Sequence, residues 1–65
     1  MPSAVIRAFS YDAERRELLV TFTTERRYVY EDVPAQVVEA MRGAFSKGRY
    51  FNRNIRTHYR FRELP

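Results

Sequence analysis

Alternation of apolar and polar residues predicts strands in the first half of the chain. In residues 18–23, Leu18, Val20 and Phe22 share one face and the intervening residues share the other, which is the period-2 pattern of a half-buried strand. Residues 5–11 are β-branched and aromatic and predict a preceding strand, which the polar residues 12–16 end. The segment 27–30 continues the pattern as a third strand.

The connection between the second and third strands sets which side chains meet. A three-residue connection through residues 24–26 places Phe22 opposite Tyr28 and Val20 opposite Tyr30, with the larger side chains on the core side. A two-residue turn would move the tyrosines to the other face. We expect the three-residue loop.

The middle of the chain has the periodicity of helices. Pro34 is suited to the first helical position and disfavours the α conformation at Val33, which we expect to act as the cap. One apolar stripe follows at helical spacing, formed by Val37, Val38, Met41, Ala44 and Phe45. Gly43 weakens the end of this helix, and Ser46 is a suitable N-cap for a second one. The pattern predicts helices over residues 34–44 and 46–54.

Alternation returns near the C-terminus. In residues 58–62, Tyr59 and Phe61 share one side and His58, Arg60 and Arg62 share the other, which predicts a last strand. The order β-β-β-α-α-β predicts an α+β fold, in which an antiparallel three-strand meander is followed by two short helices packed on one face and a C-terminal strand. The sequence does not determine how that last strand pairs.

Length and composition limit the class of protein. We expect residues 1–65 to form a single domain, because domains mostly contain about 50–250 residues. The absence of cysteine excludes disulfides and thiolate metal sites and favours the reducing cytoplasm. The N-terminus lacks the pattern of a secretory signal, and no apolar run is long enough for a membrane span. We therefore expect a cytoplasmic protein without membrane contact, most simply a monomer.

The positive charge is concentrated in the last third of the chain. Residues 41–65 carry seven Lys and Arg against one acid, a net +6, whereas residues 1–40 carry five Arg against seven acids, a net −2, which together give the net charge of +4. This localisation favours an anionic partner such as nucleic acid or an acidic protein. The alternative is an ordinary solvated surface whose arginines pair with acids of the first half.

The stretch 46–56, SKGRYFNRNIR, combines cationic, aromatic and amide side chains. On a helical wheel Arg49, Arg53 and Arg56 fall within roughly 60° of one another, while Phe51 and Ile55 point towards the other side. A helix here would bury one face and present arginines on the other.

The candidate nucleic-acid-binding residues extend this set. They are Lys47, Arg49, Tyr50, Asn52, Arg53, Arg56, Arg60, Tyr28 and Tyr30. Exposed strand tyrosines can stack unpaired bases, but aromatic residues at period 2 are more often core, and the two alternatives stay open. The ring of Tyr50 is expected to pack inward with its hydroxyl at the surface, and Asn52 is expected to contact either the nucleic acid or local backbone.

No constellation for catalysis is visible. The only histidine is His58, there is no cysteine, and no serine has a histidine or acid partner at a telling spacing. The acids near residues 12–17 and 31–32 suit a turn and a helix N-terminus better than a metal or paired-carboxylate site. No phosphate-binding glycine loop is present. We expect no enzymatic activity, no metal and no cofactor.

Several segments together resemble the KTSC domain family, named for the C-terminal extension of some lysyl-tRNA synthetases. The resemblance is carried by Tyr11-Asp12, the strand of Leu18, Val20 and Phe22, the Tyr28-Val29-Tyr30 motif, Val33-Pro34, Ser46 to Asn52 and Ile55-Arg56. It implies a fold and suggests RNA binding, with no catalysis attached. The chain departs from the family pattern in having Glu25 where the hairpin loop usually has glycine, and Thr57-His58 where glycine often follows Arg56.

Charge and resemblance lead to two functional hypotheses. The first is a small RNA-binding module, with tRNA among the candidate ligands, that holds phosphates with its basic face. The alternative is a protein interaction module whose basic face docks an acidic partner.

Overall fold

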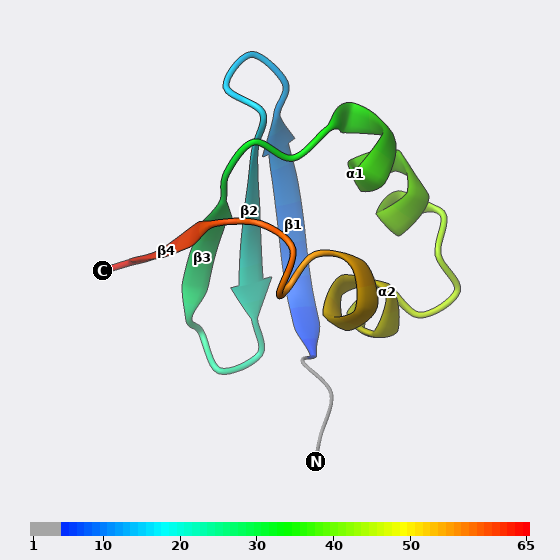
Figure 1. The fold of residues 1–65 in the computed structure, drawn as a ribbon. Coiled ribbons are helices and arrows are strands. Elements are labelled where there is room, and N and C mark those ends of the chain that lie inside the picture. The colour runs from blue at the N-terminus through cyan, green and yellow to red at the C-terminus, as the bar shows by residue number, and fades with distance from the viewer. Residues whose placement is uncertain (1–4) are drawn as a thin grey trace.

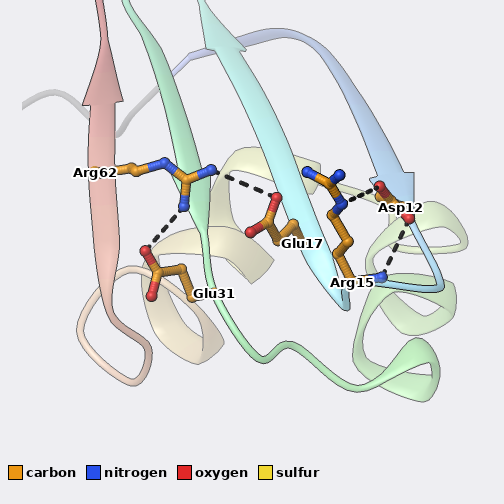
Figure 2. A network of polar contacts seen from close by, with 5 residues as sticks. All are labelled: Asp12, Arg15, Glu17, Glu31 and Arg62. Carbon is orange, nitrogen blue, oxygen red and sulfur yellow. Dashed lines mark hydrogen bonds and ion pairs between the residues drawn. The ribbon is translucent and has the colours of Figure 1, made fainter.

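The computed structural model describes residues 5–65 and contains four strands and two helices (Figure 1). In chain order they are β1 (Ile6–Asp12), β2 (Glu17–Phe22), β3 (Arg27–Tyr30), α1 (Ala35–Arg42), α2 (Lys47–Asn54) and β4 (Phe61–Leu64). The predicted order β-β-β-α-α-β and the α+β class are confirmed. Figures 1 and 2 show both helices on one face of the sheet, with β4 at the edge away from them.

The sheet is antiparallel throughout, with strand order β1-β2-β3-β4. The last strand pairs with β3, so that Phe61 lies opposite Tyr30 and Arg62 opposite Val29. It begins later than predicted, at Phe61, because residues 55–58 make a turn after α2. This pairing, which the sequence left undetermined, extends the meander by one strand.

The predicted register of the β2–β3 hairpin is wrong by two residues. Tyr28 lies opposite Val20, not Phe22, and Tyr30 lies opposite Leu18. Since side chains alternate with period 2, a shift of two residues keeps each on its predicted face. The tyrosines therefore still point to the helix-covered side.

Turn geometry explains the shifted register. The backbone N–H of Phe22 donates to the carbonyl of Arg26 at 2.9 Å, which closes a three-residue loop one position earlier than predicted. Glu25, the last residue of that loop, has a φ of 73°. A three-residue hairpin loop commonly ends in this left-handed conformation, which favours glycine.

The core fills the space between β2, β3 and the helices. Its buried residues are Leu18, Val20, Tyr30, Val33, Val38, Met41, Phe51 and Ile55. Alternate residues of β2 and one side of each helix supply most of this set, which is the outcome expected from the apolar periodicities. Among them, the Phe51 ring lies 5.2 Å from Tyr30 and 5.5 Å from Phe22, centroid to centroid, and joins α2 to the sheet.

The first helix departs from the prediction at both ends. Pro34 is the N-cap, and Val33, expected to be the cap, is fully buried in the core. The helix ends at Arg42, so Phe45 falls in the connecting loop and is fully exposed instead of completing the apolar stripe. Neither helix, with eight residues each, has the length that a membrane crossing requires within residues 5–65.

The second helix forms as its sequence predicts. The Ser46 hydroxyl accepts a hydrogen bond from the Arg49 backbone N–H at 3.3 Å and thereby caps the helix. Phe51 and Ile55 are buried against the sheet, while Arg49 and Arg53 are exposed. The helix thus separates an apolar side from a cationic side.

Candidate nucleic-acid interface

A row of exposed arginines follows α2. Arg49 and Arg53 lie on the helix, and Arg56 lies just beyond its end. The Arg56 backbone N–H donates to the carbonyl of Phe51 at 2.9 Å, a π-turn of the kind found at helix C-termini. Arg49 and Arg53 are about one helical turn apart, roughly 6 Å along the axis.

Only two of the seven basic residues in 41–65 are neutralised by acids. Arg42 pairs with Glu39, and Arg62 pairs with both Glu17 and Glu31. The other five form no ion pair within the described part of the chain, and we refer to them as the unpaired cations: Lys47, Arg49, Arg53, Arg56 and Arg60. The ammonium group of Lys47 donates to the carbonyl of Ala44 at 3.3 Å, which leaves its charge uncompensated.

The acids are occupied elsewhere. Of the eight acids in the chain, every one except Glu14 is ion-paired with an arginine among residues 5–65. In the first half, arginines at four positions take acid partners, in the pairs Arg7–Glu25, Arg15–Asp12, Arg16–Asp32 and Arg26–Glu63. Each pair is largely exposed and contributes little to stability. These ion pairs instead affect the charge distribution, because they leave few carboxylates to balance the unpaired cations.

The sheet face opposite the helices carries a network of paired charges (Figure 2). The Arg62 guanidinium extends from β4 across the sheet and donates to Glu31 at 2.9 Å and to Glu17 at 3.5 Å. These two hydrogen bonds raise the pKa of Arg62. On the same face, at its far end, Arg15 lies 4.0 Å from Asp12. Basic residues are therefore present on both sides of the sheet. On this side Arg15 and Arg62 have acid partners, whereas Arg27, which donates to the Pro65 carbonyl at 3.0 Å, and Arg60 form no ion pair among residues 5–65.

Tyr30 belongs to the core, so the exposed-platform alternative is wrong for this residue. Its side chain is only 4% exposed, and its ring lies between those of Phe51 and Phe61, at 5.2 and 5.5 Å. Burial raises the pKa of Tyr30, and Tyr28 adds to the increase, while the charge of Arg56 opposes it.

Tyr28 lies at the border of the core. It is half-buried, and its ring makes edge contacts with Phe22 and Phe61, both at 5.6 Å. Phe61, which the sequence did not single out, points to the same side of the sheet and remains 54% exposed. The alternation of Tyr59 and Phe61 was a visible signal, but only the pairing of β4 with β3 puts Phe61 beside Tyr28.

The polar residues of α2 divide between surface and interior. Tyr50 is half-buried and packs against the core, as expected, and its carbonyl accepts a hydrogen bond from the Asn54 amide at 3.1 Å. The Oδ1 atom of Asn52 is buried and has no hydrogen-bond partner among residues 5–65. Asn52 as a whole is partly exposed, but this oxygen hydrogen-bonds with neither solvent nor local backbone.

His58 lines a surface hollow together with Glu31, Asp32, Tyr59 and Arg60. His58 Nδ1 lies 3.4 Å from the hydroxyl of its exposed neighbour Thr57. No group of three or more potential metal-ligating side chains is found in residues 5–65. The cationic row is the feature of the described surface that stands out chemically.

Fold and charge distribution together define a small α+β domain with a cationic helix on a four-stranded antiparallel sheet. The chain belongs to the KTSC domain family, whose family model matches residues 2–59. The resemblance seen in the sequence is thereby confirmed. The match includes β1 to α2 and the turn that follows, and it ends before β4.

Known proteins are similar to this chain in sequence, in fold, or in both. An uncharacterized protein of Stutzerimonas stutzeri is 40% identical over 62 residues, covering 94% of this chain and 87% of that protein. A lysine–tRNA ligase of Nostoc punctiforme is 36% identical over 61 residues, which cover 94% of this chain but only 11% of the ligase. The crystal structure of a KTSC domain protein from Yersinia pestis superimposes with a TM-score of 0.91 at 29% identity, covering all of this chain and 92% of the other.

Proposed function

We propose that this domain binds nucleic acid, RNA foremost, by holding phosphates with the unpaired cations, and that it does so without catalysis. The observation that carries the proposal is the unequal pairing of charges. Seven of eight acids are tied to arginines, while Lys47, Arg49, Arg53, Arg56 and Arg60 keep their full charge. A surface with uncompensated guanidinium groups attracts polyanions and suits bidentate phosphate contacts.

The arginine row suits a short piece of nucleic-acid backbone. Each of its three guanidinium groups can contact one phosphate, so the row holds about three phosphates. With at most five cations engaged, binding is expected to be weak, with a dissociation constant of about 1–100 μM near physiological salt. The related lysine–tRNA ligase contains a segment similar to this chain, which gives tRNA a place among the RNAs to be tested.

Two matched triple variants test the proposal. The first replaces Arg49, Arg53 and Arg56 with alanine, and the control replaces the ion-paired Arg7, Arg15 and Arg16. Each lowers the formal net charge from +4 to +1, since 4 − 3 = 1. Fluorescence anisotropy with labelled tRNA and single-stranded RNA at low salt should show strong loss of affinity for the first variant and little for the control. Equal affinities for the two variants would contradict the proposal.

A protein partner with an acidic surface would use the same cations. This alternative is favoured by the tRNA ligase relative, in which the matching segment is a small part of a larger protein that could offer a docking surface. Pull-down with and without nuclease treatment separates the two. Protein partners that stay bound after the RNA is digested, and that the Arg49, Arg53 and Arg56 variant loses, would support docking over RNA binding.

A further inference from the structure

Phe61 is an exposed ring held in a fixed position. It lies opposite Tyr30 in the β3–β4 ladder, yet it is 54% exposed because β4 is at the sheet edge away from the helices (Figure 1). Its centroid is 5.6 Å from that of Tyr28, with the rings at 60°, and 5.5 Å from that of Tyr30, at 35°. Two ring contacts therefore support Phe61 from the core side, and the remainder of the ring faces solvent.

The other exposed phenylalanine lacks this support. Phe45 lies in the loop between the helices, is fully exposed, and is in contact with no other aromatic ring among residues 5–65. Exposure alone therefore does not distinguish Phe61. What distinguishes it is the half-buried Tyr28 beside it and the buried Tyr30 beneath the pair.

One unpaired cation lies near this ring pair, and another lies on the opposite face of the sheet. Arg60 alternates with Phe61, and its carbonyl accepts a hydrogen bond from the Glu31 backbone at 2.8 Å, so it lies opposite Glu31 on the face away from the helices. Arg56 directly follows the buried Ile55 at the end of α2, and its backbone N–H donates to the carbonyl of Phe51, whose ring lies 5.2 Å from that of Tyr30. Glu63, an acid on the same face as the ring pair, is opposite Tyr28 and is paired with Arg26 at 3.1 Å.

We propose that the ring pair of Tyr28 and Phe61 stacks an unpaired base while Arg56 holds a flanking phosphate, so that the domain prefers single-stranded RNA to duplex. The inference rests on the proposed function and narrows it to one class of RNA. In a duplex the faces of the bases are covered by their neighbours, whereas an unpaired base can stack on an exposed aromatic ring. Combining a cationic track with such rings is how proteins bind single strands without strict sequence preference.

Affinity measurements on two substitutions test the platform. Phe61→Ala removes the supported ring, and Phe45→Ala is the matched control because it removes an exposed phenylalanine without ring contacts. Anisotropy is measured with a short uridine oligonucleotide and with an RNA hairpin stem of equal phosphate number. Phe61→Ala should weaken binding of the single strand by about 5- to 150-fold. It should leave stem binding unchanged, and Phe45→Ala should alter neither.

A tryptophan placed at the site provides a second readout that does not depend on losing the ring. The chain has no tryptophan, so Phe61→Trp introduces a single reporter whose indole can still stack. Uridine oligonucleotide should quench the fluorescence of Phe61→Trp at concentrations that match its binding curve. The control Phe45→Trp should keep its fluorescence at the same saturation.

The outcomes separate this inference from the function on which it rests. If wild type binds single-stranded RNA through Arg49, Arg53 and Arg56, but Phe61→Ala binds as wild type and Phe61→Trp is not quenched, the platform is wrong and RNA binding stands. An equal loss of single-strand and stem binding by Phe61→Ala also overturns the platform. If wild type binds neither RNA at low salt, the proposed function falls first and the platform falls with it.

Discussion

The salt dependence of RNA binding is the most quantitative consequence of the charge distribution. Each phosphate that a protein contacts on a single strand contributes about −0.7 to the slope of log affinity against log salt. If all five unpaired cations engage, the slope is about −3.5, and affinity falls by about 130-fold between about 50 and 200 mM salt. Replacing Arg49, Arg53 and Arg56 leaves two contacts, a slope of about −1.4 and a fall of about 7-fold.

The control is what makes this prediction sharp. The variant lacking Arg7, Arg15 and Arg16 has the same net charge as the first triple variant but retains all five unpaired cations. Its slope should stay near that of wild type, at about −3.5. Anisotropy titrations with one single-stranded RNA at four or five salt concentrations suffice to measure both slopes. Parallel lines for the two variants would refute the reasoning, since net charge and not placement would then govern binding.

Three further predictions concern the elements that position the site. Glu25→Gly removes a side chain from a left-handed backbone position but also loses the exposed ion pair with Arg7. Arg7→Ala loses the same ion pair alone, so the melting temperature of Glu25→Gly should exceed that of Arg7→Ala by several degrees. A lower melting temperature for Glu25→Gly would contradict the assigned strain. Ser46→Ala removes the N-cap of α2 and should lower the free energy of unfolding by about 1 kcal/mol. The melting temperature followed by circular dichroism should then fall by roughly 4–8 °C. An unchanged melting temperature would show that the cap does not contribute to stability. Because burial raises the folded-state pKa of Tyr30 above the 10.0 of an unperturbed tyrosine, its contribution to the free energy of unfolding is fully present below pH 10.0 and is lost as pH rises through the folded value. Denaturant titrations above pH 10.0 should therefore show a steeper loss of stability for wild type than for Tyr30→Phe.

Local patterns predicted the elements well, and their limits lie in the turns. The alternation in β2 identified its core face, since side chains there follow a strict period of two. The hairpin register could not be predicted, because it depends on the left-handed conformation of Glu25, which is uncommon for glutamate. Phe45 fits the helical spacing of the α1 stripe, but the chain leaves the helix at Arg42. The apolar spacing in the sequence therefore continues beyond the residue at which the helix ends.

The candidate site, like the fold, could be predicted only in part from the sequence. The excess of positive charge in residues 41–65 is a property of composition and could be counted. Which arginines keep that charge depends on ion pairs between distant residues, such as Arg62 with Glu17, and these follow only from the sheet topology. The platform residue Phe61 likewise depends on the pairing of β4 with β3.

That pairing also has a consequence for how the domain folds. Strands β1 to β3 are joined by short turns and can associate early, whereas β4 reaches β3 only after both helices have been accommodated between them in the sequence. Contacts between residues far apart in the chain carry a larger loop-closure cost and slow folding. The fourth strand is therefore expected to dock late and to be the first part of the sheet to open. Hydrogen exchange should accordingly be faster at the amides of β4 than at those of β2.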